Sequence, residues 1–314
     1  ARAAMAPGLD VASLAGGVAV ITGGASGLGL ACARRCARSG LHLVVADVRP
    51  DALEKAVAAL RAEFSAVRVH GARCDVTDPA SVRGLLLEVQ RAFAEPIRYL
   101  GANAGVLFPR ATVLTGSADE WALTLKVNVL GVVNTLQVFV PAMLAHEQTC
   151  LVVNTASLAG LLSGMSGPYG ASKHACVALS EALHDELQWA KGGERVRLHV
   201  LCPGMVNTSL KSSSNETTER RADIGGPIDG TKRVKGDAHS AATVAIFADE
   251  RWTASMDADF VAEELFAGIA RGDFYVVVES AAAMAESLRS VEARSAGIAS
   301  RPTRHRHLIA RPRM

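Results

Sequence analysis

The sequence predicts an α/β protein built on a parallel sheet of about seven strands, with helices on both faces. Two observations point to this fold class. Short runs of consecutive apolar residues recur along the 314-residue chain, as in strands that are buried on both faces. Stretches with helical spacing separate these runs, and such alternation is typical of strand–helix–strand crossover units.

The N-terminal half shows the alternation most clearly. Residues 18–21 form an uninterrupted apolar run that ends at a glycine cluster, and the helical pattern at 27–39 stops at Gly40. The next helical stretch is rich in Ala, Leu, Glu and Lys, and Pro79 suits the first turn of the one after it. Further strands are expected at 41–46, 67–71 and 98–102, and helices at 51–64 and 79–93.

The same rhythm continues to the last apolar run. A long helical region is expected at 119–146, and the run at 196–201 ends in a Cys-Pro-Gly turn. The remaining strands are expected at 150–154, 196–201 and 274–278, and the remaining helices at 168–190 and 257–271.

We expect one domain over residues 1–314, with its core at about 14–280. The polar, mixed stretch at 205–256 interrupts the rhythm, and an insertion of this length in a compact domain is usually a lid or a loop. The basic tail at 291–314 is expected to be a solvated end.

Bulk composition excludes several classes of protein. The net charge of +2 gives no sign of a nucleic-acid partner, and no apolar run reaches the roughly 18 residues of a membrane span. The six cysteines form no CxxC pair and sit in apolar runs, so we expect reduced, buried thiols and no metal site, although Cys32 and Cys36 are spaced four apart. Without a signal-peptide core we expect a cytoplasmic protein, and a processed organellar form stays open.

A glycine-rich turn follows the first strand, in the segment Thr22-Gly23-Gly24-Ala25-Ser26-Gly27-Leu28-Gly29. Such a turn lets the backbone approach a pyrophosphate, whose oxygens then meet the free N–H groups of the following helix. Asp47 stands at the end of the next strand, where a carboxylate accepts hydrogen bonds from ribose hydroxyls and repels a 2′-phosphate. Because Val48 is not basic we expect NAD as the cofactor, while Arg49 keeps NADP open as the less favoured choice.

The candidate chemistry lies in Tyr169-Gly170-Ala171-Ser172-Lys173, which opens a helix. Tyr169 and Lys173 are one turn apart on the same face. A phenol, with a reference pKa near ~10, is a poor base at neutral pH, and a neighbouring ammonium group stabilises its phenolate. Tyr169 is thus suited to be the acid/base of a hydride transfer, and Lys173 to tune it and hold the nicotinamide ribose, so both are also expected to contact the cofactor. Ser157, just past a strand end, is suited to position the substrate oxygen. Taken singly, each of these residues is more often an ordinary surface or turn residue.

These ordered motifs, from Leu14 to about Val278, resemble the short-chain dehydrogenase/reductase family. The resemblance implies a Rossmann-like, doubly wound fold and a catalytic tetrad of Asn128, Ser157, Tyr169 and Lys173, with Asn128 supporting a water that links Lys173 to solvent. It also assigns cofactor contacts to further positions, with Ala102 standing where the family usually has Asn. These contacts are Asp75 and Val76 at the adenine, the turn Asn103-Ala104-Gly105, and Pro203, Gly204, Val206 and Thr208 at the nicotinamide.

The apolar stretches at 106–108 and 158–167 favour a neutral or hydrophobic alcohol or ketone, although basic residues of the predicted lid could still reach an anion. The family resemblance implies a homodimer or homotetramer. The predicted helix at 168–190 carries small apolar residues that suit either a core or an interface. Three alternatives stay open: a catalytically silent NAD-binding regulator, an NADP-dependent carbonyl reductase, and an epimerase or dehydratase of the extended branch of the family.

Overall fold

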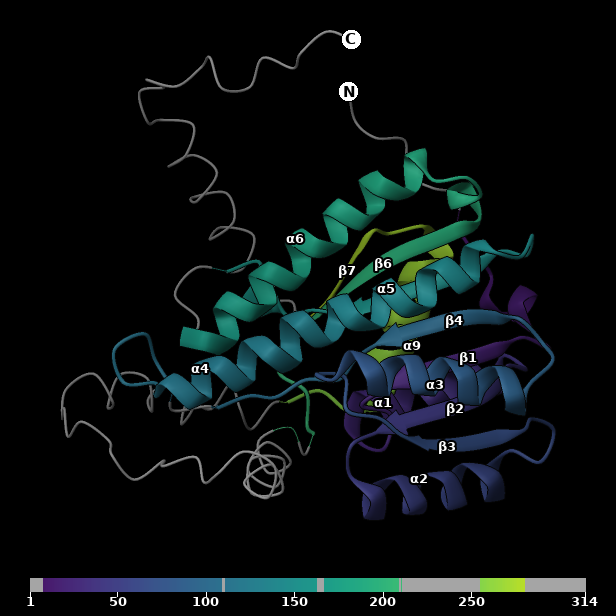
Figure 1. Cartoon of the computed structure of the whole chain (residues 1–314), viewed down its shortest axis with the longest axis horizontal. Helices are drawn as coiled ribbons and strands as arrows, with labels where there is room; N and C mark the ends of the chain where they lie inside the picture. The colour runs from purple at the N-terminus through teal and green to yellow at the C-terminus, as the bar shows by residue number, and fades with distance from the viewer. Residues whose placement is uncertain (1–7, 109–110, 163–166, 209, 211–254, 280–314) are drawn as a thin grey trace, which may run out of the picture.

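The computed structural model shows a seven-stranded parallel sheet with helices on both faces (Figure 1). The structure describes residues 8–108, 111–162, 167–208, 210 and 255–279. The predicted basic tail lies outside the described residues. So does most of the predicted lid, of which only the two ends are described.

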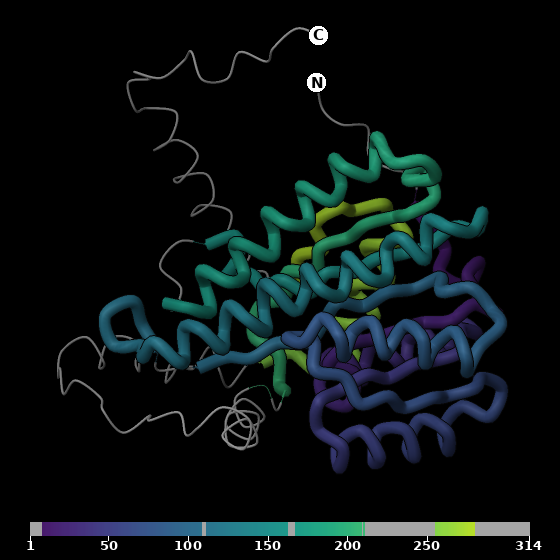
Figure 2. The backbone as a smooth tube through the Cα atoms, viewed as in Figure 1, coloured from purple at the N-terminus to yellow at the C-terminus, as the bar shows by residue number. Residues whose placement is uncertain are grey.

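Every predicted strand is present, and the sheet order is β3-β2-β1-β4-β5-β6-β7 with all neighbours parallel. The order reverses beside β1, because the chain first builds outward to β3 and then crosses back to β4. In the backbone trace the strands before β4 form one end of the sheet and the later strands form the other (Figure 2). The predicted doubly wound, Rossmann-like fold is confirmed. The strands are β1 (Val18–Thr22), β2 (His42–Asp47), β3 (Val69–Arg73), β4 (Ile97–Ala102), β5 (Cys150–Thr155), β6 (Val196–Pro203) and β7 (Tyr275–Val278).

Two hydrophobic layers lie on opposite faces of this sheet. Successive side chains of a strand point to opposite faces, so Val18 and Val20 of β1 join one layer while Ala19 and Ile21 join the other. All five residues of β1 are buried, which explains why its sequence is continuously apolar.

The helices divide between the two layers. Burial of one apolar face of each helix against the sheet is the main source of its stability. One face is covered by α1 (Gly27–Arg38), α2 (Pro50–Glu63) and α9 (Ala258–Arg271). The other is covered by α3 (Pro79–Ala92), α4 (Ala118–Leu125), α5 (Gly131–Leu144) and α6 (Gly167–Trp189).

The long helical region expected at 119–146 is not one regular helix. A capping box between Ser117 and Glu120 starts α4, and a π-helical turn, η2 (Lys126–Leu130), separates α4 from α5. By length and hydropathy the whole run Ala118–Leu144 could cross a membrane, but half of its most apolar window is buried inside the protein, as expected of a core helix. Single π-helical turns are frequent at functional sites, and this one contains Asn128.

Candidate active site

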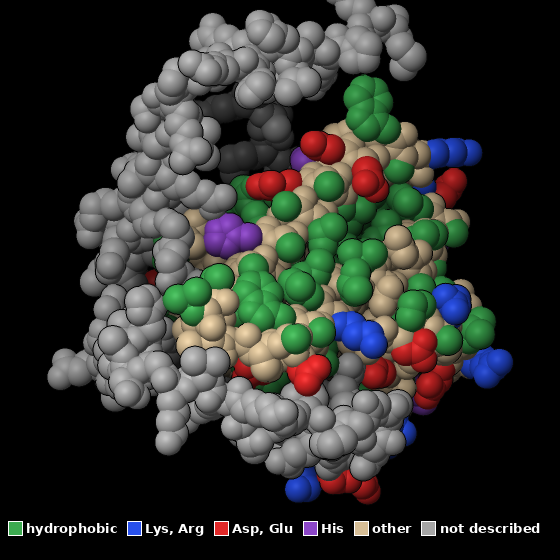
Figure 3. All heavy atoms as spheres, turned by 60° about the vertical axis from the view of Figure 1, so that its left-hand side comes forward, with side chains coloured by type: hydrophobic (Ala, Val, Ile, Leu, Met, Phe, Trp, Pro, Cys, Tyr) green, Lys and Arg blue, Asp and Glu red, His purple; other side chains and the backbone are tan. Residues whose placement is uncertain are grey.

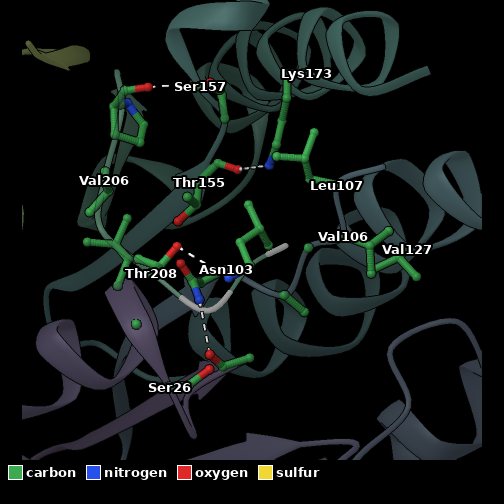
Figure 4. A pocket seen from close by; sticks show the side chains of 18 of the residues that line it. Ser26, Asn103, Val106, Leu107, Val127, Thr155, Ser157, Lys173, Val206 and Thr208 are labelled. Carbon is green, nitrogen blue, oxygen red and sulfur yellow. Dashed lines mark hydrogen bonds between the residues drawn. The ribbon is translucent and has the colours of Figure 1, made fainter. Parts of the chain in front are cut away.

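A pocket opens at the carboxyl ends of the strands, where the strand order reverses between β1 and β4. Figure 4 shows Lys173 and Ser157 at one end of this pocket and Ser26 at the other. Gly29 and Asn128 lie behind the pocket wall rather than in it. The predicted residues that line the pocket are Gly23, Ser26, Gly27, Leu28, Asp47, Asp75, Val76, Asn103, Ala104, Gly105, Ser157, Tyr169, Lys173, Pro203, Gly204, Val206 and Thr208.

The glycine-rich turn has a backbone shape that needs glycine. Gly23 and Gly27 have φ values of +61° and +50°, in the left-handed region. A Cβ on Gly23 would come within 2.8 Å of Ala104 Cα, and a Cβ on Gly29 would overlap the Gly23 carbonyl oxygen. The turn therefore leaves its backbone close to the pocket, with the N-terminus of α1 directly behind it.

The turn after β4 holds the glycine-rich turn in place. Asn103 Nδ2 donates to the carbonyl oxygens of Thr22 and Gly23 at 3.3 and 3.2 Å. The backbone N–H groups of Asn103 and Ala104 donate to Thr22 Oγ1 at 3.1 and 3.3 Å. Asn103, which the family resemblance assigned to cofactor contact, thus also fixes the shape of the turn.

The segment after β6 returns onto the glycine-rich turn. A Cβ on Gly27 would lie 3.0 Å from Thr208 Cβ, so these two residues are already in close contact. Val206 is paired with Met256 in an isolated parallel bridge. Together these contacts close the side of the pocket that leads from Pro203 towards the start of α1.

Asp47 is buried at the end of β2, with only 4% of its surface exposed. Its Oδ2 accepts from the Ala25 N–H at 3.3 Å, which ties it to the glycine-rich turn. The Arg49 side chain folds back over it, with Nε 3.1 Å from Asp47 Oδ1 and Nη2 3.3 Å from Oδ2. Arg49 Nη2 also donates to Ser26 Oγ at 2.8 Å, so its guanidinium group bridges the end of β2 and the glycine-rich turn at this end of the pocket.

At the opposite end, Lys173 is 4% exposed and its Nζ donates to the Thr155 carbonyl oxygen at 2.8 Å (Figure 4). The same Nζ lies 5.6 Å from the centroid of the Tyr169 ring. The first turns of α6 thus present the phenol to the pocket with a buried ammonium group beside it.

Ser157 follows β5 and is 7% exposed. Its Oγ donates to the Pro203 carbonyl oxygen at 3.3 Å and accepts from the Ala159 N–H at 3.2 Å, which caps a short 3₁₀ helix, η3 (Leu158–Gly160). These contacts fix the hydroxyl group between the ends of β5 and β6, on the same side of the pocket as Lys173 (Figure 4).

Asn128 is fully buried, and its side chain is committed to protein partners. Oδ1 accepts from the Val106 N–H at 2.8 Å, while Nδ2 donates to the Val106 carbonyl oxygen at 2.9 Å and to Ser172 Oγ at 3.0 Å. Ser172 Oγ in turn donates to the Tyr169 carbonyl oxygen at 2.7 Å. The side chain of Asn128 therefore joins the loop after β4 to the first turn of α6, which carries Tyr169.

Three pocket residues make contacts that the sequence did not predict. The backbone of Thr155 anchors Lys173, the guanidinium of Arg49 covers Asp47, and Glu279 lies against Gly204. Thr155 and Glu279 each stand at the carboxyl end of a strand, which is a usable signal because ligands bind at that edge of such sheets.

The six cysteines are free, buried thiols. All six are buried, and burial raises the pKa of Cys32 and Cys202 to about 12 and of Cys74 and Cys150 to about 11. Among the described residues there is no group of three or more His, Cys, Asp or Glu that could hold a metal ion. These thiols behave as small buried side chains.

Comparison with known proteins agrees with this geometry. The chain matches the family model described as short chain dehydrogenase over residues 17–219. It is 34% identical over 221 residues to 1-deoxy-11-beta-hydroxypentalenate dehydrogenase of Streptomyces arenae, covering 67% of this chain and 77% of that protein. The protein belongs to the short-chain dehydrogenase/reductase family. As a member of this family it is an oxidoreductase that acts on hydroxyl groups with a nicotinamide cofactor.

Two further relatives extend the comparison. The structure of a short-chain dehydrogenase/reductase from Burkholderia phymatum in complex with NAD has a TM-score of 0.76 and 34% identity, and covers 92% of this chain and 97% of that one. 3beta-hydroxysteroid dehydrogenase 2 of Eggerthella lenta is 29% identical over 251 residues, covering 79% of this chain and 91% of that protein. The likeness to the family thus extends beyond β6.

Proposed function

We propose that the protein is an NAD-dependent oxidoreductase that interconverts a secondary alcohol and a ketone, with Tyr169 as the acid/base. One observation carries this proposal: Tyr169, Lys173 and Ser157 line the same pocket as the glycine-rich turn and Asp47. The pocket therefore offers acid/base groups at one end and a dinucleotide-binding cradle at the other.

The cradle fits a dinucleotide. The glycine-rich turn and the start of α1 offer backbone N–H groups to a pyrophosphate, and Gly23 and Gly27 line the pocket there without side chains. Asp47 supplies a buried carboxylate for the ribose hydroxyls. Val206 and Thr208 line the pocket between Pro203 and the glycine-rich turn, and in this proposal they hold the carboxamide. When bound, the nicotinamide supplies the chemistry that this chain lacks, which is to accept or donate the hydride.

The chain itself supplies the proton transfer. The Tyr169 hydroxyl gives a proton to, or takes one from, the substrate oxygen, and the ammonium group of Lys173 stabilises the phenolate form. Ser157 positions the substrate oxygen from a site fixed by Pro203 and Ala159. Asn128 is a positioning residue in this proposal, because its side chain holds the first turn of α6 against the loop after β4.

The substrate in this proposal is neutral or hydrophobic. Leu107, Leu158 and Met205 line the pocket with apolar side chains, and Leu107 lies beside Lys173 (Figure 4). Two curated relatives are named for substrates with a hydroxyl group, a hydroxypentalenate and a hydroxysteroid.

We also propose that the working unit is a homodimer or homotetramer. Two of the five small apolar residues of α6 are exposed and three are partly buried, of which Leu183 packs against the core. The exposed ones favour an interface, as do Leu125 of α4 and Leu130 of η2, which are 38% and 52% exposed. Figure 3 shows hydrophobic side chains spread over the face that carries these long helices. The residues in question on α6 are Ala175, Ala178, Leu179, Ala182 and Leu183.

The test is a set of NADH-absorbance assays with hydrophobic secondary alcohols and ketones. Tyr169→Phe should abolish turnover while leaving the Kd for NADH within about threefold, because the lost hydroxyl acts only in the chemical step. Tyr275→Phe is the matched control: it removes a phenolic hydroxyl that is bonded to Glu181 away from the pocket, and it should keep full activity. Tight NADH binding with no turnover on any substrate would instead favour a silent NAD-binding regulator.

A further inference from the structure

We infer that Asn134 is a positioning residue for the cofactor, because it fixes the wall of the pocket against which the adenine lies. Asn134 belongs to α5 and does not itself line the pocket, but its side chain reaches the loop between β3 and α3. The inference rests on the nicotinamide-dependent function proposed above, and it concerns how firmly the adenosine half of the cofactor is held.

The order of the strands decides where the adenine lies. In the proposed binding mode the pyrophosphate lies at the glycine-rich turn after β1, and a ribose lies at Asp47, at the end of β2. The next strand in the sheet is β3, so the base carried by that ribose lies at the end of β3. The pocket is lined there by Cys74, Asp75 and Val76.

Val76 is held from behind by α5. Asn134 Nδ2 donates to the Val76 carbonyl oxygen at 2.8 Å. The Val76 side chain packs on the helix backbone at Gly131, where an added Cβ would come within 2.6 Å of Val76 Cγ2. The first contact fixes the backbone of Val76 and the second fixes its side chain, so this part of the wall has little freedom to move.

The loop between β3 and α3 also has bonds of its own. The N–H and the hydroxyl group of Thr77 donate to Asp75 Oδ1 at 2.9 and 2.8 Å, and the Asp75 N–H donates to Ser81 Oγ at 3.0 Å. These bonds set the shape of the loop. The bond from Asn134 instead joins the loop to α5, so it sets where the loop lies relative to the rest of the pocket.

The same helical segment supports other parts of the pocket without help from Asn134. Val127 of η2 lines the pocket near Val106 (Figure 4), and Asn128 joins the loop after β4 to the first turn of α6. These supports remain when the Asn134 amide is removed. The loss should therefore loosen the wall at the adenine and leave the acid/base end of the pocket as it is.

The experiment measures the Kd for NADH by fluorescence, and the Kd values for AMP and nicotinamide mononucleotide by displacement of NADH. In Asn134→Ala the Kd values for NADH and AMP should rise by about three- to tenfold, the equivalent of one hydrogen bond, while that for nicotinamide mononucleotide stays within about twofold. Gln137→Ala is the matched control: it removes an exposed side-chain amide from the same helix and should leave all three Kd values unchanged.

Three results would overturn the inference. The Kd for AMP in Asn134→Ala could stay within about twofold of the wild-type value, or the Kd for nicotinamide mononucleotide could rise as much as that for AMP, as expected of a residue that only stabilises the fold. The third is a wild-type protein that binds NADH but not AMP.

Asn134→Asp covers the case in which Asn134→Ala does not fold by circular dichroism. It keeps the shape of the side chain and loses the Nδ2 donor, so it should raise the Kd for AMP and not that for nicotinamide mononucleotide. The same results in this variant overturn the inference. A wild-type protein that binds neither NADH nor AMP would instead refute the proposed function, and the inference with it.

Discussion

Replacing Gly29 with alanine should both destabilise the fold and impair cofactor binding. Gly29 is in the first turn of α1, behind the pocket, where an added Cβ would overlap the Gly23 carbonyl oxygen and come 2.6 Å from Asn103 Nδ2. The Gly23 backbone cannot move away freely, because Asn103 Nδ2 donates to its carbonyl oxygen. The methyl group therefore has to push the glycine-rich turn and the turn after β4 apart.

Two contributions lower the free energy of unfolding of Gly29→Ala, and a third raises it. Overpacking costs about 1–3 kcal/mol, losing the Asn103 bonds costs about 1 kcal/mol each, and the better helix propensity of alanine returns about 1 kcal/mol. With two Asn103 side-chain bonds lost, the net loss in the free energy of unfolding should be about 2–4 kcal/mol. Because the turn that faces the pyrophosphate is displaced, the Kd for NADH should rise by about tenfold or more.

Gly84→Ala is the matched control for this variant. Gly84 is an exposed residue of α3, and a Cβ there would meet nothing within 4 Å, so the same change should stabilise the protein by about 0.5–1 kcal/mol. Urea unfolding followed by circular dichroism gives both free energies, and NADH fluorescence gives the Kd values. The reasoning is refuted if Gly29→Ala costs less than about 0.5 kcal/mol and binds NADH as the wild type does.

Three further predictions concern buried polar groups. Asn128→Leu leaves the N–H and the carbonyl oxygen of Val106 without their Asn128 partner and removes the bond that Ser172 Oγ accepts, so urea unfolding should show a loss of about 3 kcal/mol. A loss under about 1 kcal/mol would contradict the hydrogen-bonding role of Asn128. Burial lowers the pKa of His199, whose Nδ1–H donates to the Asp273 carbonyl oxygen, so the unfolded chain takes up the proton first as the pH falls below about 6.5, the usual pKa of a histidine. The contribution of His199 to stability is therefore full above that pH and declines below it, by at most about 1.4 kcal/mol per pH unit. An NMR titration of the ring that gives a pKa at or above about 6.5 would contradict this. Because burial holds the pKa of Cys32 and Cys202 at about 12, iodoacetamide at pH 8 should label neither in the native protein and both in urea, as read by mass spectrometry; rapid native labelling would show that the burial is wrong.

The sequence predicted the architecture well, because the features that specify it are local. Each strand of the sheet is a short apolar run, and burial on both faces requires such a run whatever its neighbours are. The expected strand at 67–71 was placed two residues early, since β3 is at the edge of the sheet and its pattern is only partly apolar. The break in the long helical region was not predicted, because η2 differs from an α-helix in hydrogen bonding and not in composition.

The sequence by itself determined the motifs in which neighbouring residues act together: the glycine-rich turn, the Tyr169–Lys173 pair one helical turn apart, and the acidic residue at the end of β2. Only the tertiary structure decided what each of these groups touches. It showed that Arg49 folds back on Asp47, that Asn128 is committed to protein partners behind the pocket wall, and that Glu279 stands beside Gly204. The physical reason is that the contacts of Asn128 and Glu279 join residues far apart in the chain, which strand and helix packing bring together. The contact between Arg49 and Asp47 instead depends on which rotamer the arginine adopts. Neither kind of contact leaves a periodic pattern in the sequence.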